Sequence, residues 1–283
     1  MTSIATSLVQ AREQLTAASS SARLDAELLL AQVLLQPREY LHTWPERELS
    51  PAQVEAFNTL IYKRRDGWPI AYLLGHQAFW SLDLLVTPAT LIPRPETELL
   101  VETVLQLGKH DQAQTILDLG TGSGAIALAI ARERPHWQVH AVDTSSEALD
   151  VARNNAQRHQ INNVTFHHSN WLSSLPSDLR ADIIVSNPPY IAAGDPHLQQ
   201  GDLRFEPAGA LVAGVDGLDA IRIILATCHS HLQANGWLVI EHGYDQATAV
   251  QPLFAQHHFK EIQQHPDLAG HVRVTAGKLS RSE

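Results

Sequence analysis

The hydrophobic pattern of the first 75 residues is that of helices. Residues 21–35 form an Ala- and Leu-rich segment that Ser21 can cap and that Pro37 ends. A second helical segment begins at Pro51, where apolar residues recur at i, i+3 and i+7 and form one stripe. The spacing therefore predicts a small N-terminal bundle of helices.

A different pattern begins near residue 79. Short strand-like stretches cover residues 80–86 and 90–92, Pro88 separates them, and a Pro-Arg-Pro sequence follows at 93–95. We interpret this region as a hairpin that links two domains. The predicted division is an N-terminal helical domain over residues 1–78, a hairpin linker over 79–95 and a larger domain over 96–283.

Beyond residue 96 the pattern alternates between helices and strands. Alternation of this kind predicts an α/β domain with a mostly parallel, seven-stranded sheet covered by helices, and ligands bind such sheets at the carboxyl ends of their strands. The expected helices are 97–107, 124–133, 146–160, 217–231 and 244–256, and the expected strands are 115–119, 138–142, 164–167, 182–186, 237–241, 260–264 and 271–276.

Charge and composition narrow the range of partners. The 283-residue chain has a net charge of −10 and a sequence pI of about 5.9, which argues against a surface that grips nucleic acid mainly through phosphates. Its one compact basic run, residues 63–65, is expected as a solvated helix end. A protein or small-molecule substrate is favoured, and no nucleic-acid substrate is expected.

Cysteine and histidine usage bears on compartment and metals. Cys228 is the only cysteine, so the chain can form no internal disulfide and no cysteine-based zinc site. The start of the chain lacks the features of a signal peptide, and no run of 18 apolar residues occurs. Its 16 histidines include pairs, but none has a third ligand at useful spacing. We expect a cytoplasmic protein without membrane contact and without a metal site.

A glycine-rich turn follows the first strand of the predicted sheet. It comprises Gly120, Thr121, Gly122, Ser123 and Gly124, between an apolar strand and an Ala-rich helix. Glycines let a ligand approach the bare backbone. With an alanine in third place, the turn also satisfies the dinucleotide fingerprint, so a nicotinamide cofactor is an alternative at this point.

The next two strands end in residues that suit a nucleoside. Asp143 closes its strand 23 positions after Gly120, where a carboxylate can accept both hydroxyl protons of a ribose. Trp171 follows the third strand together with Asn170, and an indole offers a broad face for stacking an adenine. The sequence thus predicts a nucleoside site spread over three neighbouring strand ends.

The sequence Asn187-Pro188-Pro189-Tyr190 follows the fourth strand and predicts a site for a nitrogen nucleophile. The Asn187 side-chain oxygen and the Pro188 carbonyl can accept both protons of a planar NH2 group, and Tyr190 can stack on its plane. Such nitrogens are poor nucleophiles, so catalysis must come from their orientation toward a methyl sulfonium, which is worth up to roughly 7 to 11 kcal/mol. Neither a metal nor a nucleophilic serine or cysteine is required.

With these motifs the chain resembles the bacterial release factor glutamine methyltransferases, which are class I enzymes with a Rossmann-like fold. The resemblance spans nearly the whole chain. Beyond the glycine turn and the Asn-Pro-Pro-Tyr sequence, it rests on residues 91–98, on Phe205-Glu206-Pro207 and on 210–218. It implies S-adenosyl-L-methionine as cofactor and S-adenosyl-L-homocysteine as product. It also implies that the glutamine of the Gly-Gly-Gln motif in class 1 peptide chain release factors is methylated on its side-chain amide nitrogen (N5).

The resemblance also implies roles for single residues. Gly120 to Gly124 would surround the methionine part of the cofactor, Asp143 the ribose and Trp171 the adenine. Asn187 would contact both the cofactor and the substrate amide, and the glutamine pocket would be completed by Pro188, Pro189 and Tyr190. The N-terminal bundle and residues 191–216 would receive the release factor. Apart from the resemblance, we expect the protein to be a monomer.

Two related activities stay open as alternatives. A glutamine methyltransferase that modifies a ribosomal protein would carry the same motifs. An adenine-N6 nucleic-acid methyltransferase would present the same amine geometry, but it must also extract a base and hold phosphates.

Overall fold

The computed structural model describes residues 2–280, which divide into two compact units. One unit comprises the described residues up to His76 together with His197–Phe205. The other comprises Gln77–Pro196 and the described residues from Glu206 onward.

The first unit is helical. Its core is formed mainly by leucines and isoleucines on the inner faces of the longer helices, with Phe57 almost fully buried among them. A capping box between Ser50 and Gln53 starts the longest helix, with Pro51 in its first turn. The helices are α1 (Ile4–Leu15), α2 (Ala22–Leu34), α3 (Arg38–Thr43), α4 (Pro51–Arg65) and α5 (Ile70–Leu74).

The predicted bundle is present, but it contains helices that the sequence pattern did not predict, namely α1, α3 and α5. The expected cap of α2 is also wrong. The Ser21 hydroxyl donates to Asp25 at 2.8 Å instead of accepting from the helix backbone. Asp25 is 3 % exposed and also accepts from Ser19, so this buried carboxylate competes successfully for the serine hydroxyls.

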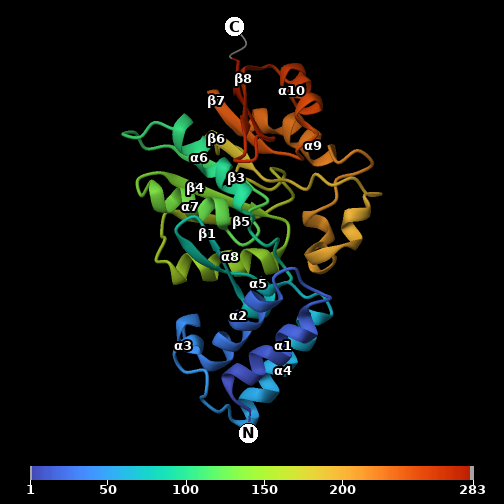
Figure 1. Ribbon diagram of the computed structural model, residues 1–283. Helices are drawn as coiled ribbons and strands as arrows, with labels where there is room; N and C mark the ends of the chain where they lie inside the picture. The colour runs from blue at the N-terminus through green and yellow to red at the C-terminus, as the bar shows by residue number, and fades with distance from the viewer. Residues whose placement is uncertain (1, 281–283) are drawn as a thin grey trace. The chain divides into compact units, whose positions relative to one another are not determined.

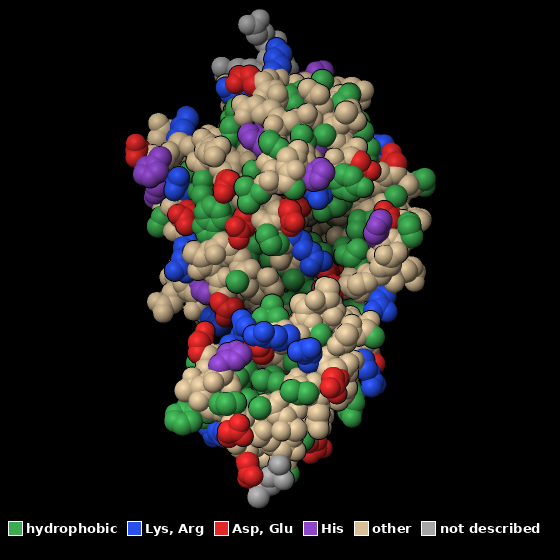
Figure 2. All heavy atoms as spheres, in the orientation of Figure 1, with side chains coloured by type: hydrophobic (Ala, Val, Ile, Leu, Met, Phe, Trp, Pro, Cys, Tyr) green, Lys and Arg blue, Asp and Glu red, His purple; other side chains and the backbone are tan. Residues whose placement is uncertain are grey.

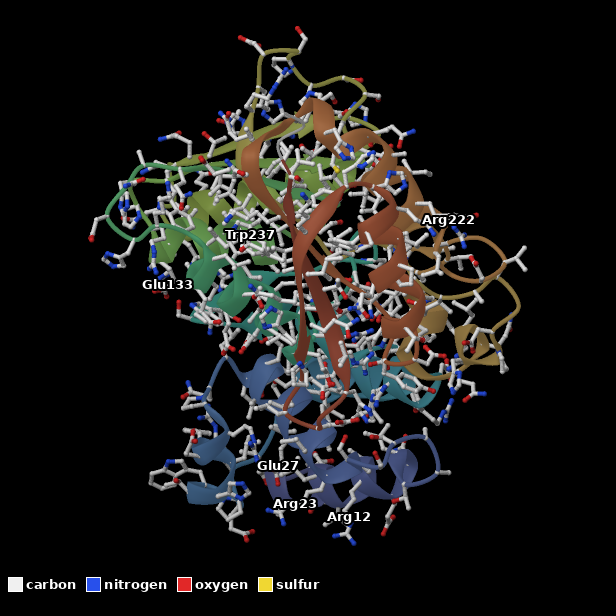
Figure 3. The ribbon with its side chains drawn as sticks, turned by 90° about the horizontal axis from the view of Figure 1, so that it is seen from above. Arg12, Arg23, Glu27, Glu133, Arg222 and Trp237 are labelled. Carbon is white, nitrogen blue, oxygen red and sulfur yellow. The ribbon has the colours of Figure 1, made fainter. Side chains whose placement is uncertain are left out.

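The basic run at the end of α4 is only partly solvated. Arg64 is mostly buried, and its guanidinium pairs with Asp25 at 2.7 Å and donates to the carbonyl of Trp68 at 3.0 Å. A second buried acid, Glu27, accepts from Arg23 at 2.8 Å, and Figure 3 labels both residues. Glu27 also accepts from Arg38 at 2.7 Å. Ion pairs with buried carboxylates thus hold α2 against its neighbours.

The segment His197–Phe205 belongs to the helical unit although it is distant in sequence. It contains most of two short 3-10 segments, η2 (Pro196–Gln199) and η3 (Gly201–Phe205). The Phe205 ring packs against Trp68 with ring centroids 5.1 Å apart. Periodicity along the chain contains no signal for such a contact.

A two-stranded hairpin follows the helical unit, but its strands are not where the sequence pattern placed them. They are β1 (His76–Phe79) and β2 (Leu82–Leu85), with Trp80 at a φ of +56° in the turn between them. The expected second strand at 90–92 is absent, because Thr90 instead closes a turn onto the carbonyl of Thr87 at 2.9 Å.

The second unit is built on a seven-stranded sheet with the order β5-β4-β3-β6-β7-β9-β8 (Figure 1). All neighbouring pairs are parallel except those made by β9, which is antiparallel to both of its neighbours. This confirms the predicted sheet. Its strands are β3 (Thr115–Leu119), β4 (Gln138–Asp143), β5 (Val164–His168), β6 (Ala181–Ser186), β7 (Leu232–Glu241), β8 (Phe259–Pro266) and β9 (Val272–Leu279).

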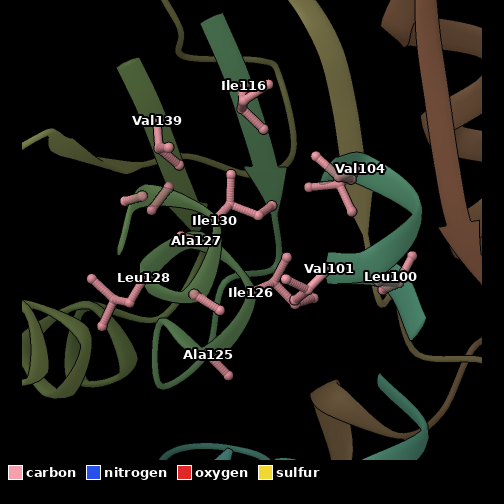
Figure 4. Packing of buried hydrophobic residues seen from close by; sticks show 14 of the residues in the cluster. Leu100, Val101, Val104, Ile116, Ala125, Ile126, Ala127, Leu128, Ile130 and Val139 are labelled. Atoms are coloured by element: carbon pink, nitrogen blue, oxygen red, sulfur yellow. The ribbon is translucent and has the colours of Figure 1, made fainter. Parts of the chain in front are cut away.

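Helices cover both faces of this sheet. One buried cluster includes α6 and α7, and in Figure 4 Ile126 of α7 lies against Val101 of α6. Another buried cluster packs α9 and α10 against the opposite face. The helices are α6 (Glu98–Leu107), α7 (Ala125–Glu133), α8 (Ser146–Arg158), α9 (Asp219–Thr227) and α10 (Ala247–Gln256), preceded by the 3-10 segment η1 (Pro95–Thr97).

The strand order reverses between β3 and β6. The chain runs outward from β3 through β4 to β5, then returns to β6 on the other side of β3. Leu119 and Ser186 are paired at the carboxyl ends of these two strands, so Gly120 and Asn187 follow at adjacent points. Open α/β sheets bind their ligands at such a reversal.

Candidate active site

A cavity of about 550 Å³ lies at the carboxyl ends of β3, β4, β5 and β6, within the second unit. Its walls include residues from the predicted glycine turn, from the ends of the next two strands and from the Asn-Pro-Pro-Tyr sequence. These lining residues are Gly120, Gly122, Asp143, Asn170, Trp171, Asn187 and Pro189. A further wall is formed by residues 89–91 together with Pro207, Gly209 and Ala210.

The glycine turn takes a conformation that requires glycine. Gly120, Gly122 and Gly124 have φ values of +75°, +55° and +85°, a region that side-chain-bearing residues rarely adopt. The amides of Gly120 and Thr121 both donate to the carbonyl of Val142, at 2.8 and 2.9 Å. A Cβ at Gly122 would meet no described atom within 4 Å, so its bare backbone faces open space in the cavity wall.

Asp143 joins the ends of β3 and β4. One of its carboxylate oxygens accepts from the amide of Gly122 at 2.8 Å, and the other accepts from the amide of Ser145 at 2.9 Å. The helix cap is supplied by Ser145, whose hydroxyl accepts from the amide of Ala148. Asp143 is therefore not required as the cap of α8, and its half-exposed carboxylate lines the cavity.

Trp171 lies on the same wall as the glycine turn. Its ring comes within 3.8 Å of the position that a Cβ would take at Gly120. The backbone of Trp171 has a φ of +50°. Two residues earlier, the amide of Ser169 donates to the carbonyl of Asp143 at 3.0 Å. The indole is thus held at the cavity, half-buried, next to the end of β4.

The Asn-Pro-Pro-Tyr sequence directly follows β6. Asn187 and Pro189 are half-buried and line the cavity, whereas Pro188 is buried. The side-chain amide of Asn187 donates to the hydroxyl of Thr97 at 3.1 Å. This contact leaves the side-chain oxygen of Asn187 available as an acceptor.

Tyr190 is held from two sides. Its carbonyl accepts from the side-chain amide of Gln246 at 3.0 Å and lies directly against Gly217. Burial raises the pKa of the Tyr190 phenol above its usual range, and the nearby carboxylate of Glu241 acts in the same direction. The phenol therefore stays protonated.

Two buried carboxyl groups beneath the site were not predicted from the sequence. Burial raises the pKa of Asp118 to about 7. The hydrogen bond that Asp118 accepts from the Thr121 hydroxyl at 2.6 Å lowers this pKa, but by less than burial raises it. Burial also raises the pKa of Glu241, at the end of β7, to about 7. An acidic residue inside or ending an apolar strand is the sequence signal that could have identified both.

Two of the distinctive sequence blocks meet in the second unit. Arg94 forms an ion pair with the buried carboxylate of Glu206, and it thereby joins residues 91–98 to the loop that provides Pro207 and Gly209 to the cavity wall. The same loop bridges Val212 to Ile191, just after Tyr190. These contacts place residues 206–212 beside the Asn-Pro-Pro-Tyr sequence.

Among residues 2–280, no group of three or more His, Cys, Asp or Glu side chains is arranged to hold a metal ion. No helix within the same residues has the length and apolar character needed to cross a membrane. Basic and acidic side chains are interspersed on the face that Figure 2 shows.

Comparison with known proteins relates most of the chain to one group of enzymes. The methyltransferase small domain family matches residues 95–208, and the PrmC N-terminal domain family matches residues 6–75. The release factor glutamine methyltransferase of Pseudomonas aeruginosa is 53% identical, over 92% of this chain and 94% of that protein. The Coxiella burnetii enzyme of the same name is 49% identical over 94% and 95%, and the Escherichia coli one is 46% identical over 92% and 94%.

Solved structures share the fold at lower identity. A methyltransferase from Pyrococcus furiosus matches with a TM-score of 0.54 and 16% identity, over 79% of this chain and 98% of that one. A 16S ribosomal RNA methyltransferase from Thermus thermophilus, solved with AdoMet and guanosine, matches with a TM-score of 0.53 and 19% identity, over 72% and 49%. These two similarities support the fold alone.

Proposed function

The chain belongs to the family of release factor glutamine methyltransferases, and on this premise we propose that it methylates the side-chain amide nitrogen (N5) of a release factor glutamine. The acceptor is the glutamine of the Gly-Gly-Gln motif in class 1 peptide chain release factors, and S-adenosyl-L-methionine is the methyl donor. The observation that carries the proposal is that Asn187 and Pro189 line the same cavity as Gly122 and Asp143.

The cavity fits the proposed cofactor in size and in chemistry. Its volume of about 550 Å³ lies within the range of cofactor sites. The open backbone at Gly122 admits close approach of a ligand, the Asp143 carboxylate can accept from ribose hydroxyls, and Trp171 offers an aromatic face. Gly120 to Gly124, Asp143, Trp171 and Asn187 would hold the cofactor. When bound, S-adenosyl-L-methionine supplies a methyl group on a positively charged sulfur.

The Asn-Pro-Pro-Tyr sequence would hold the nucleophile. The amide nitrogen of glutamine carries two protons, and the side-chain oxygen of Asn187 and the carbonyl of Pro188 are two acceptors on one short segment. Pro188 and Pro189 restrict the backbone between them. Tyr190, which stays protonated, can lie against the plane of the amide.

Catalysis in this arrangement comes from orientation. An amide nitrogen shares its lone pair with the carbonyl, so it attacks only when that lone pair is aimed at the electrophilic carbon. Acceptors on both N–H bonds fix the plane of the amide and polarise those bonds, and positioning of this kind contributes up to roughly 7 to 11 kcal/mol. Asn187 is the catalytic residue whose side chain does this.

We also propose that separate parts of the chain carry out methyl transfer and bind the release factor. Residues 96–283 carry methyl transfer, while residues 1–78 and the stretch 191–216 receive the release factor, with 79–95 as linker. In support of this division, residues 197–205 of that stretch form part of the helical unit. A connection of this length between two elements is otherwise uncommon.

The proposal is tested by offering the purified enzyme and labelled S-adenosyl-L-methionine to equal amounts of release factor, ribosomal protein and DNA. We expect label in the release factor alone. Label in the ribosomal protein alone, or in DNA alone, would assign the enzyme to one of the related activities. A release factor with its Gly-Gly-Gln glutamine changed to glutamate is the matched acceptor control and should take no label.

A further inference from the structure

One side chain contacts the backbone at both ends of the stretch 191–216. The side-chain NH2 group of Gln246 donates to the carbonyl of Tyr190, directly before this stretch, at 3.0 Å. It also donates to the carbonyl of Asp216, the last residue of the stretch, at 3.4 Å. An NH2 group has two protons to give, so one carboxamide can serve both carbonyls. Gln246 thus joins two points of the backbone that are far apart in sequence.

The orientation of the Gln246 carboxamide is fixed by Gly243. Its side-chain oxygen accepts from the backbone amide of Gly243 at 2.8 Å, and the backbone amide of Gln246 donates to the carbonyl of Gly243 at 3.0 Å. A backbone amide can only donate, so the carboxamide oxygen must face Gly243 and the NH2 group must face the two carbonyls. Gly243 is buried and lies two residues after the end of β7. The side chain is therefore anchored at the carboxyl end of the sheet.

Backbone hydrogen bonds also join the two ends of the stretch. The amide of Ile191 donates to the carbonyl of Leu211 at 2.8 Å, and the carbonyl of Ile191 accepts from the amide of Ala213 at 2.9 Å. We call this paired region, residues 191–193 and 211–214, the base of the stretch. The contacts of Gln246 lie just outside it, one on either side.

The returning end of the stretch is held as well. The carboxylate of Asp216 accepts from the guanidinium of Arg222 at 2.9 and 2.5 Å. The next residue, Gly217, fits closely against the same contacts. A Cβ there would lie 2.2 Å from the carbonyl oxygen of Tyr190 and 2.7 Å from the side-chain nitrogen of Gln246. The two chain ends and the Gln246 side chain are therefore packed without room for a further methyl group.

Tyr190 needs a restraint that the neighbouring prolines do not supply. The proline rings fix φ at Pro188 and Pro189, but they leave the dihedrals of Tyr190 itself free. Those dihedrals determine where the aromatic ring lies. A hydrogen bond to the Tyr190 carbonyl restrains the backbone on the far side of this residue, where the prolines have no effect.

We infer that Gln246 is a positioning residue, whose carboxamide closes the base of the stretch 191–216 and thereby places Tyr190 against the amide of the substrate. This inference rests on the proposed function, because Tyr190 needs a fixed place only if it holds a substrate. Gln246 follows β7, which lies on the opposite side of β6 from β3 and β4. The proposed cofactor residues Gly122 and Asp143 are at the ends of β3 and β4, so loss of Gln246 should leave cofactor binding unchanged.

Two substitutions test the two hydrogen-bonding halves of the carboxamide. Gln246→Met keeps a similar length and removes all of these hydrogen bonds. Gln246→Glu keeps an acceptor for the amide of Gly243, but its carboxylate has no proton to give and would face two carbonyl oxygens. With the release factor as substrate, we expect kcat to fall about tenfold in Gln246→Met, the size of one net hydrogen bond, and further in Gln246→Glu.

The loss should fall on kcat, while KM for the release factor stays within about threefold, because the backbone hydrogen bonds of the base remain. Gln251 lies on the same helix, α10, and is exposed. Gln251→Met and Gln251→Glu are therefore the matched controls, and their kinetics should equal those of wild type.

A second measurement follows the base of the stretch without using activity. Hydrogen exchange of the amides of Ile191 and Ala213 reports how often the base opens. We expect exchange about tenfold faster in Gln246→Met than in wild type, and an unchanged rate in Gln251→Met. The calorimetric affinity for S-adenosyl-L-methionine should stay within about threefold of wild type in every variant, which also shows that each variant is folded.

The outcomes separate this inference from the proposed function. If wild type methylates the release factor but Gln246→Met equals Gln251→Met in kcat and in exchange, the inference is overturned and the function stands. If wild type does not methylate the release factor although exchange rises in Gln246→Met, Gln246 closes the base and the proposed function fails. A loss of cofactor affinity in Gln246→Met, or a loss of kcat/KM carried by KM alone, would overturn the specific role toward Tyr190.

Discussion

The backbone amide of Gly122 donates a 2.8 Å hydrogen bond to the carboxylate of Asp143. This contact ties the glycine turn after β3 to the acidic end of β4. The same carboxylate accepts from the amide of Ser145 at 2.9 Å, so Asp143 organises two loops of the cavity. The carboxylate that is proposed to bind the ribose therefore also holds the glycine turn in place.

Asp143→Ala is therefore expected to weaken binding of S-adenosyl-L-methionine by about 10- to 100-fold, as for loss of hydrogen bonds to a charged group. Isothermal titration calorimetry measures this directly. Asp150→Ala, on the exposed face of α8, is the matched control and should bind normally. An unchanged affinity in Asp143→Ala would remove Asp143 from the cofactor site.

Asn187→Ala removes the acceptor oxygen proposed to hold the substrate amide. We expect turnover to fall by roughly 10² to 10³, comparable to removal of one polar contact in the transition state. Folding should change little, because Asn187 is only half-buried. Steady-state kinetics and a thermal melt check the two statements, with the exposed Asn162→Ala as control. Near-normal turnover would show that Asn187 has no part in the mechanism.

Gly217 lies directly against the carbonyl of Tyr190. It has a φ of +75°, and a Cβ there would overlap that carbonyl and approach the side-chain amide of Gln246 to 2.7 Å. Gly217→Ala should displace Tyr190 and lower kcat/KM for the release factor by at least tenfold, while cofactor binding persists.

Gly194→Ala is the matched control for this substitution. Gly194 is exposed, has no positive φ, and a Cβ there would meet no described atom within 4 Å. Its kinetics should equal those of wild type. Equal losses in both variants would point to the loop as a whole and not to the Tyr190 carbonyl.

Asp118 gives a prediction for stability against pH. Burial raises its pKa from 3.8 to about 7, so between these values the folded protein keeps a proton that the unfolded chain loses. Each pH unit in this window lowers the free energy of unfolding by about 1.4 kcal/mol. This contribution is fully present below pH 3.8 and is lost as pH rises through 7.

Asp118→Asn cannot ionise and so lacks this dependence. Relative to wild type, its free energy of unfolding should rise by about 2 to 3 kcal/mol between pH 5 and pH 8. Urea denaturation at the two pH values measures the change, and Glu241 contributes equally to both proteins. Asp178→Asn, which is exposed, should show no such trend. A constant difference between Asp118→Asn and wild type would contradict the raised pKa.

The sheet was predictable because its strands are short apolar runs that end in turn residues. The run at 115–119 and the run ending at Ser186 are buried parallel strands, and each is followed directly by a chemical motif. Ligands bind at the carboxyl ends of parallel strands. This rule, together with the order of the strands along the chain, was enough to predict that the glycine turn and Asn187 lie at the same edge of the sheet.

The parts that could not be predicted depend on contacts between distant residues. Thr97 has no motif of its own, and its place beside Asn187 follows only from a hydrogen bond between residues 90 positions apart in the sequence. The segment 197–205 joins the helical unit through Phe205, which local patterning does not reveal. The expected strand at 90–92 is absent because the amide of Thr90 forms a turn with the carbonyl of Thr87.

The central claim is that a carboxamide nitrogen is aimed at the methyl group of S-adenosyl-L-methionine by Asn187 and Pro188. The most direct test is tandem mass spectrometry of release factor after reaction with the enzyme, with the methyl group located to a single atom of the modified peptide. The account predicts one methyl group on the side-chain nitrogen of the Gly-Gly-Gln glutamine, and its absence after reaction with Asn187→Ala. A methyl group on any other residue of the release factor, or on an oxygen, would contradict it.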